Sequence, residues 1–246
     1  MDERRLTVIG HLEELRKMVI VSLVALALAA IACAPLVSVI LKLLKLPAAG
    51  LIEKLVYFSP EESFLIYMKI SVLAGLLLAF PVIAYQFWKF IEPALEDRFK
   101  KNAAAFTAAA TLAFAGGCIF AYRVLLPTAL RFLLTIGKGE LEPVISATKY
   151  ISFVVGFMAA CGAVFEMPVA CYFLARVGLL NARAMRSKFK YAIVVICIAA
   201  AIITPTGDMF NMMMLAVPML ALYEVSIWVV FISRKRRARD AAEIVR

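Results

Sequence analysis

The sequence predicts an all-α integral membrane protein with six transmembrane helices, kinked and set in a curved, concave arrangement. Of its 246 residues, 64% are hydrophobic and only 18% are charged, a composition far from that of soluble proteins. The apolar residues also gather in long runs. Because about 20 such residues cross a hydrocarbon core of about 30 Å as a helix, each run is a candidate span.

Six runs bounded by polar residues or turn residues meet this description. They cover approximately residues 18–44, 64–88, 103–126, 150–175, 191–203 and 209–232. The fifth is short, because about 13 residues at about 1.5 Å each give only about 20 Å. Lysines before it and a Thr-Pro pair after it are typical of membrane boundaries, so we count it as a span. We take residues 1–246 as one membrane domain with a basic cytoplasmic tail over residues 234–246.

Prolines inside the runs predict bent helices. Pro81, Pro168 and Pro218 each lie within a span, where the missing N–H kinks the helix and frees a carbonyl group. Bent helices favour a curved wall over a straight bundle. Before the second run, Ser59-Pro60-Glu61-Glu62 is typical of a helix start, with serine as N-cap and proline at the first helical position.

The distribution of basic residues predicts that both termini are cytoplasmic. Of the 27 lysines and arginines, 19 lie in the N-terminus, the second and fourth loops and the C-terminus. Cytoplasmic flanks carry such an excess. A cleaved signal peptide ending near Ala30-Ile31-Ala32 is the competing interpretation, but the apolar run continues to Leu44, which is too long for an ordinary signal core.

The sequence lacks the usual parts of zinc sites, Ser-His or Cys-His relays and nucleotide-binding loops. The five cysteines lie inside apolar runs without disulfide or metal spacing, which favours a role in helix packing. His11 is the only histidine, and no Gly-rich phosphate loop occurs. The sequence therefore predicts a protein that is not an enzyme and has no cofactor or metal.

Two acidic residues lie within the spans. Glu166 sits about ten residues from the inner end of the fourth span, where a charged group costs about 3 kcal/mol. Either a local bond near Pro168 satisfies it, or it receives a polar group from another chain. Glu224 lies nearer the inner end of the sixth span, where it could pair with a basic residue such as Arg234 or bind a partner. For Asp208, capping the sixth helix is the simplest role.

Further acids cluster on the predicted cytoplasmic face, at Glu13-Glu14 and at Glu92, Glu96 and Asp97. The face is basic overall and should repel a cationic partner, so local acidic pockets would decide what binds. Carboxylates hold guanidinium groups in a planar, bidentate fashion, so two acidic patches could receive two neighbouring arginines. Charge alone equally allows these acids only to balance the basic residues beside them.

Several segments together resemble TatC, the multispanning receptor of the twin-arginine translocation pathway, along nearly the whole chain. The segments are His11-Leu12-Glu13-Glu14-Leu15-Arg16, Ser59-Pro60-Glu61-Glu62-Ser63-Phe64, Phe80-Pro81, Tyr85-Gln86-Phe87-Trp88-Lys89-Phe90-Ile91-Glu92-Pro93-Ala94-Leu95, Phe165-Glu166-Met167-Pro168-Val169, Thr204-Pro205-Thr206-Gly207-Asp208, Leu215-Ala216-Val217-Pro218-Met219 and Leu222-Tyr223-Glu224. Their order and spacing, with six spans, identify the chain as a member of this family.

The resemblance implies that Glu14, with Arg16 beside it, helps to bind the twin-arginine signal peptides of folded precursors. It implies that the first cytoplasmic loop, which begins at a structural proline, Pro93, forms the other half of that site. The family usually places a glutamate six residues after this proline, where this chain has Phe99. Glu96 or Asp97 could stand in for it.

The resemblance further implies partners within the membrane. Glu166 and Glu224 would contact polar residues of single-span proteins of the TatA/TatB type. The outer end of the fifth and sixth spans would be their docking region, through Thr204, Pro205 and Asp208. Met212 occupies a position there that is commonly polar in the family.

The predicted function is therefore that of the core receptor of a twin-arginine translocase in the bacterial-type inner membrane. It would bind signal peptides, associate with further copies of itself in a larger complex, and recruit single-span subunits for export driven by the protonmotive force. The alternative is a proton-coupled secondary transporter that uses Glu166 and Glu224 to bind a small solute.

Overall fold

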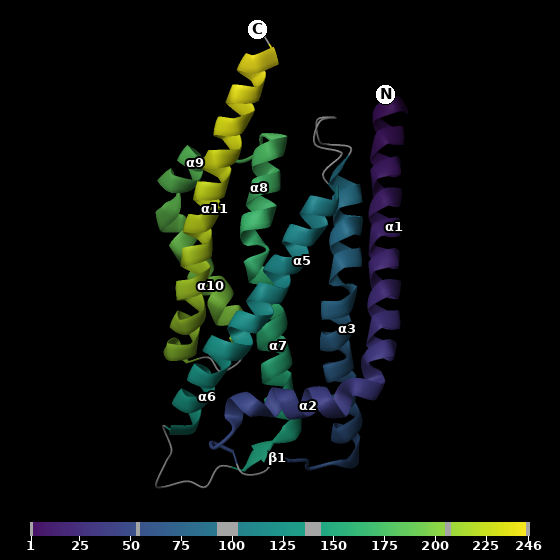
Figure 1. The fold of residues 1–246 in the computed structure, drawn as a ribbon, viewed down its shortest axis with the longest axis vertical. Helices are drawn as coiled ribbons and strands as arrows, with labels where there is room; N and C mark the ends of the chain where they lie inside the picture. Colours follow the sequence, from purple (N-terminus) through teal and green to yellow (C-terminus); the bar gives the residue numbers. More distant parts are fainter. Residues whose placement is uncertain (1, 53–54, 93–102, 136–143, 205–207, 245–246) are drawn as a thin grey trace. The chain divides into compact units, whose positions relative to one another are not determined.

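The protein is almost entirely helical in the computed structural model, which describes residues 2–52, 55–92, 103–135, 144–204 and 208–244 (Figure 1). Side chains are described within these ranges from Gly10 to Ser233. The helices are α1 (Asp2–Cys33), α2 (Val37–Lys45), α3 (Pro60–Ile91), α5 (Ala103–Phe120), α6 (Leu126–Thr135), α7 (Ala147–Phe165), α8 (Met167–Val177), α9 (Ala182–Ser187), α10 (Phe189–Ile203) and α11 (Met209–Ile244). A π-helical segment, Ala121–Leu125, joins α5 to α6. Strands β1 (Leu55–Val56) and β2 (Ile145–Ser146) pair in parallel.

Apolar helices occur at the positions of the predicted membrane spans. Within the described residues, five helical stretches are long and apolar enough to cross a membrane: residues 10–48, 60–91, 103–135, 147–177 and 209–233. Helix α10, which corresponds to the predicted fifth span, is a shorter apolar helix of 15 residues, as the sequence predicted. The all-α membrane fold class is therefore confirmed.

The chain divides into two compact units. The first comprises Met1–Leu44 and Tyr57–Leu112, and so contains α1, nearly all of α2, α3 and the first part of α5. The second comprises Lys45–Val56 and Ala113–Arg246, and contains the remaining helices and both strands. Each unit is described separately below.

The first apolar run is not one straight helix. The sequence predicted a span over residues 18–44, but α1 ends at Cys33 and a 3₁₀ turn, Ala34–Leu36, follows it. Pro35 lies in this turn, and its missing N–H explains why the α-helical ladder ends there. Helix α2 then leaves at a steep angle to α1 (Figure 1) and buries Val37 and Leu44.

The prolines within the other spans differ in effect. Helices α3 and α11 continue through Pro81 and Pro218. The fourth span, by contrast, is divided into α7 and α8 at Glu166, and Pro168 lies in the first turn of α8. The predicted helix start before the second span is confirmed, since α3 begins at Pro60 and the Ser59 carbonyl accepts a hydrogen bond from the Glu62 N–H.

Small residues allow helices to approach closely. In the first unit, a Cβ atom added to Gly75 of α3 would lie 2.6 Å from the backbone nitrogen of Ala30 in α1. In the second unit, one added to Gly117 of α5 would lie 2.6 Å from the carbonyl oxygen of Cys161 in α7. Helices in lipid associate through such close packing, because lipid tails are as apolar as the side chains they replace. Cys33, Cys118 and Cys161 are buried as thiols, in keeping with the predicted packing role.

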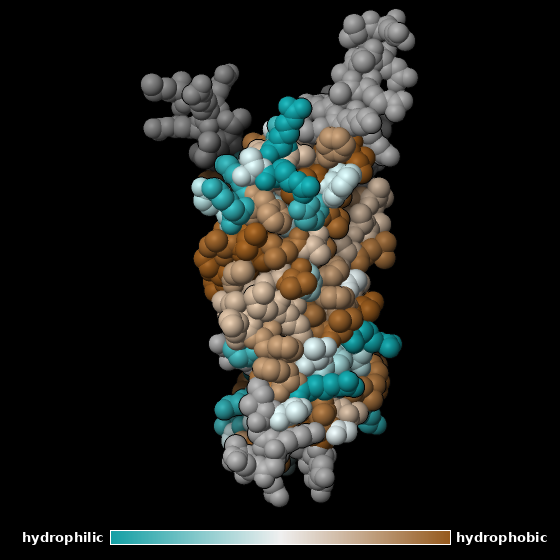
Figure 2. All heavy atoms as spheres, turned by 90° about the vertical axis from the view of Figure 1, so that its left-hand side faces the viewer, coloured by the Kyte–Doolittle hydropathy of each residue, from teal (hydrophilic) through white to brown (hydrophobic). Residues whose placement is uncertain are grey.

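One face of the second unit has the pattern of a membrane protein. Figure 2 shows hydrophobic side chains in a band across the middle of this face, with hydrophilic residues toward its two ends. Helices α10 and α11 supply highly exposed apolar side chains, among them Val195 (63%), Ile202 (79%) and Trp228 (61%). Exposed apolar surface of this extent is typical of a face that contacts lipid or another protein.

We expect Gly75→Ala to lower the stability of the protein in detergent by about 1–3 kcal/mol, because the new methyl group overpacks the contact with Ala30. The matched control is Gly116→Ala, since a Cβ atom at Gly116 meets nothing within 4 Å. Thermal unfolding of both variants measures the difference. A Gly75→Ala protein as stable as the control would show that the contact tolerates expansion.

Candidate functional site

A groove lies where the N-terminal half of α1 meets the C-terminal end of α3, within the first unit. Its volume is about 470 Å³, which is in the range of ligand-binding pockets. Glu14, Lys17 and Met18 line it from α1, and Gln86, Lys89, Phe90 and Glu92 line it from the end of α3. Residues three and four apart share a face of a helix, so both helices turn one stripe of side chains toward the groove.

His11 connects the two sides of this groove. Its ring stacks on Phe90 of α3 with 4.4 Å between ring centroids and 22° between planes. Its Nδ1 lies 3.6 Å from a carboxylate oxygen of Glu14, one turn further along α1. The only histidine of the sequence therefore helps to fix α1 against α3 and to orient the carboxylate of Glu14.

The predicted groove residues are only partly brought together. Glu14 lines the groove, but Arg16 does not, because two residues along a helix correspond to a rotation of about 200°. Pro93, Glu96 and Asp97 lie outside the described residues.

Gln86 and Lys89 line the groove but were absent from the predicted site, whereas Glu92, which also lines it, belongs to one of the two acidic patches that the sequence offered for binding arginine. The signal that could have found Gln86 and Lys89 was their helical spacing with Phe90 inside one motif.

Glu166 occupies the break in the fourth span. It ends α7 and precedes α8, and its N–H and C=O bond to Ala163 (3.2 Å) and Ala170 (2.8 Å). Its carboxyl group interacts with the backbone of Phe114 in α5. Its Oε1 atom is buried and has no hydrogen-bond partner among the described residues. The carboxyl group thus retains hydrogen-bonding capacity within a membrane span.

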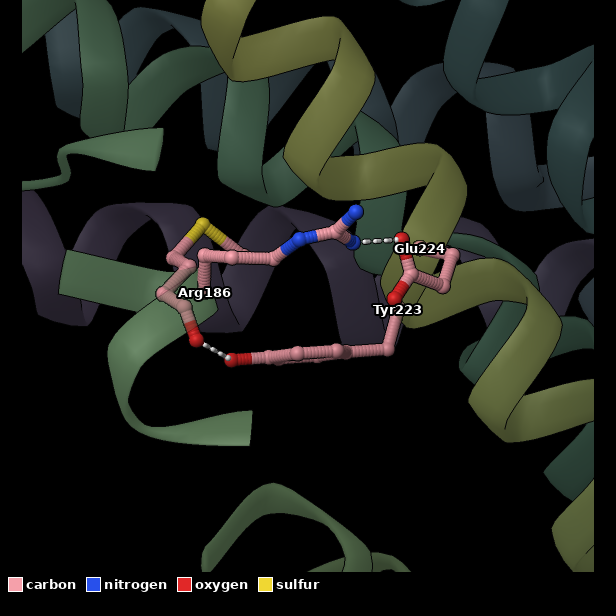
Figure 3. Close-up of polar contacts among 4 residues, drawn as sticks. Arg186, Tyr223 and Glu224 are labelled. Carbon is pink, nitrogen blue, oxygen red and sulfur yellow. Dashed lines mark hydrogen bonds and ion pairs between the residues drawn. The ribbon is translucent and has the colours of Figure 1, made fainter. Parts of the chain in front are cut away.

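Glu224 is paired, but with a different residue from the one the sequence suggested. Arg186 of α9 donates to its carboxylate over 2.5 Å, whereas the side chain of Arg234 lies outside the description. Beside it, the Tyr223 hydroxyl donates to the backbone carbonyl of Met185 at 3.0 Å (Figure 3). The ion pair is exposed and contributes about 0–1 kcal/mol by itself, but the two bonds together hold α9 against α11.

The corner between α10 and α11 is built from short-range polar contacts. Thr204 ends α10, is 4% exposed and donates its hydroxyl to the Ala200 carbonyl at 2.8 Å. Asp208 accepts hydrogen bonds from the backbone N–H of Asn211 (2.7 Å) and from its side-chain amide (2.8 Å), so its predicted capping role is confirmed. Met212 is partly exposed in the first turn of α11, while Pro205 falls in a gap of the description.

Comparison with known proteins places this arrangement in a family. The family model for Sec-independent protein translocase protein (TatC) matches residues 10–218. The chain belongs to the TatC family. The matched region includes the acids of the groove and Glu166, and it ends before Glu224.

Relatives and a solved structure share most of their length with this TatC family member. The Sec-independent protein translocase protein TatC of Carboxydothermus hydrogenoformans is 36% identical over 93% of this chain and 94% of its own. The chloroplastic TATC of Arabidopsis thaliana is 33% identical over 93% of this chain and 67% of its own. A crystal structure described as the twin arginine translocase receptor TatC superposes with a TM-score of 0.82 at 36% identity, covering 91% of this chain and 99% of that one.

We expect Asp208→Ala to destabilise this TatC family member by about 1 kcal/mol, because the start of α11 loses its capping carboxylate. Asp208→Asn, which keeps an acceptor for the Asn211 N–H, should lose less. Hydrogen exchange of the first turn of α11, together with the unfolding temperature, reports the change. Equal protection in the Ala and Asn variants would contradict a capping role.

Proposed function

We propose that this chain is the signal-peptide receptor subunit of a twin-arginine translocase, and that it works as a binding protein and not as an enzyme. The observation that carries the proposal is the groove lined by Glu14 at the end of the α1–α3 pair. The family membership supports it, since the matching solved structure is described as the twin arginine translocase receptor.

In this proposal the two arginines of a precursor's signal peptide reach the groove from the cytoplasm. A carboxylate can accept two parallel hydrogen bonds from one guanidinium, a geometry that an ammonium group cannot copy. Glu14 supplies one such acceptor, and His11 and Phe90 hold it in place. Arg16 and the loop acids Glu96 and Asp97 remain candidates for contacts at the edge of the site.

The same proposal fixes the orientation in the inner membrane. The excess of lysine and arginine predicts that the N-terminus, the loop after α3, the loop around α9 and the C-terminus are cytoplasmic. The proposal keeps one membrane domain over residues 1–246 with six spans and a basic cytoplasmic tail over residues 234–246.

Partners within the membrane are the second part of the proposal. The buried Oε1 of Glu166 would accept a hydrogen bond from a polar residue of a single-span subunit of the TatA/TatB type. The corner around Thr204, Pro205, Asp208 and Met212 would receive the end of such a subunit. Glu224, which pairs with Arg186 near the inner end of the sixth span, would contact the same subunit closer to the cytoplasm. Export would then draw on the protonmotive force and on further copies of this chain.

We expect Glu14→Gln to weaken binding of a twin-arginine precursor by about 10- to 100-fold, because a hydrogen bond to a charged group is lost. Glu13→Gln is the control, since Glu13 neighbours Glu14 but does not line the groove. Photo-crosslinking from position 18, which lines the same groove and leaves position 14 free for the substitution, measures the binding to precursors with two arginines or two lysines. If position 18 labels neither precursor in the inserted, folded protein with its natural Glu14, the receptor proposal fails and a solute transporter becomes the hypothesis to test.

We expect Glu166→Leu to reduce copurification of the single-span subunit by about 5- to 30-fold, because a polar contact in lipid contributes about 1–2 kcal/mol. Precursor binding at the groove should persist. Glu166→Gln, which keeps hydrogen-bonding groups, should retain more of the partner. Unchanged copurification in the Leu variant would exclude Glu166 as the contact.

A further inference from the structure

The second unit contains a cavity near the start of α7, where the fourth span begins. Its volume is about 410 Å³, which is within the range of ligand-binding pockets. Tyr150 of α7 lines it and is only 4% exposed. The other described lining residues come from the end of α2, the segment after it and β1: Lys45, Leu46, Ala48, Ala49, Ile52 and Leu55. The cavity is distinct from Glu166 and from the α10–α11 corner.

Local backbone structure holds these residues next to α7. A 3₁₀ turn, Leu46–Ala48, follows α2, and Pro47 lies within it. Gly50 has a φ of 79°, a left-handed conformation that glycine adopts without strain, and this lets the chain reverse. Leu55 of β1 then pairs with Ile145 of β2, just before α7 begins. The walls of the cavity are therefore tied together by the backbone.

The lining of the cavity combines one charged group with an apolar surface. Lys45 is exposed and supplies an ammonium group, while the ring of Tyr150 closes the buried side. The remaining described lining residues are leucine, isoleucine and alanine, and none of the described lining residues is acidic. A lysine ammonium binds phosphate oxygens as a compact charge. A fully polar solute would leave hydrogen-bonding groups unpaired against the apolar walls, so an anion attached to hydrocarbon fits this lining better.

The surroundings of the cavity are those of a membrane surface. Tyr150 lies in the first turn of the span over residues 147–177, and tyrosine is enriched where spans meet water. Leu46, Val56 and Val144, which line the cavity or adjoin its two paired strands, expose their apolar side chains. Apolar surface beside an exposed lysine is typical of the interfacial layer, where the lysine stem lies along hydrocarbon and its charge reaches the headgroups.

We propose that this cavity binds the headgroup of an acidic phospholipid. The phosphate would accept a hydrogen bond from the Lys45 ammonium, and the hydrocarbon next to it would lie against Leu46, Ile52 and Leu55. The lining favours an acidic headgroup over a zwitterionic one, because no described lining residue offers an acid to a cationic group of the ligand. In the orientation proposed above, this end of the span meets the outer leaflet. The site is independent of precursor binding.

The test uses the full-length protein in nanodiscs of phosphatidylcholine with a small fraction of phosphatidylglycerol that carries a photoactivatable group at the start of one acyl chain. Lys45→Gln removes the cation, and Ala49→Phe fills the cavity from an exposed position without changing the charge. The matched control is Lys42→Gln, because Lys42 is also an exposed lysine of α2 but does not line the cavity. Mass spectrometry measures the label on peptides that cover residues 46–56 and 144–154.

We expect Lys45→Gln and Ala49→Phe each to lower labelling of these peptides by about fivefold, the effect of one lysine near an acidic membrane surface. Lys42→Gln removes the same charge from the protein and should leave the labelling nearly unchanged. An excess of unlabelled phosphatidylglycerol should compete with the probe. Added phosphatidylcholine and inorganic phosphate should not.

Three results would overturn the proposal. Equal labelling in the Lys45→Gln and Lys42→Gln proteins would show that only the overall charge attracts the lipid. Competition by phosphatidylcholine as strong as that by phosphatidylglycerol would remove the preference for an acidic headgroup. Competition by inorganic phosphate would make the cavity a site for a free anion. Loss of precursor labelling from position 18 with lipid labelling retained would contradict only the receptor function, so the two failures are distinguishable.

Discussion

In a bilayer, every backbone N–H and C=O that faces lipid has to find its partner within the chain, because the hydrocarbon core offers no water. Where a helix is interrupted, nearby groups of the protein must therefore form hydrogen bonds with the backbone N–H and C=O groups that the helix leaves unpaired. At Glu166, the backbone N–H donates to the Ala163 carbonyl and the backbone carbonyl accepts from the Ala170 N–H. At the α10–α11 corner, Thr204 and Asp208 use their own side chains for the same purpose. Glu166, Thr204 and Asp208, three of the polar residues considered for partner contacts, thus lie where the helical ladder is interrupted.

Close packing of the first two long helices determines whether the groove exists at all. Gly75 lets α3 approach the backbone of α1 at Ala30, and the stacked rings of His11 and Phe90 join the same two helices further along. A shift of α1 by one residue would turn its side chains by about 100° and carry Glu14 off the groove. The position of the Glu14 carboxylate in the groove consequently depends on the whole contact between α1 and α3.

Hydropathy was sufficient to predict the fold class and the short fifth span, because length and apolarity are local properties of the sequence. It could not predict the turn at Ala34–Leu36, since the apolar run continues to Leu44 and carries no information on direction. Contacts between residues distant in the sequence could not be predicted from hydropathy either. Nothing local distinguishes Arg186 from other basic residues as the partner of Glu224, or brings Glu92 into one groove with Glu14, because both facts depend on how helices pack.

The overall charge of +10 constrains how such a groove can work. A cationic segment is repelled by the protein as a whole, and beyond a Debye length of about 8 Å that interaction is largely screened. Attraction must therefore come from contacts within a few ångströms. With two acids set against two lysines, the groove offers little net charge, and a ligand gains affinity mainly through hydrogen-bond geometry. Under the proposed receptor function, selection by geometry would let the groove accept paired arginines and reject lysine-rich segments that net charge alone could not exclude.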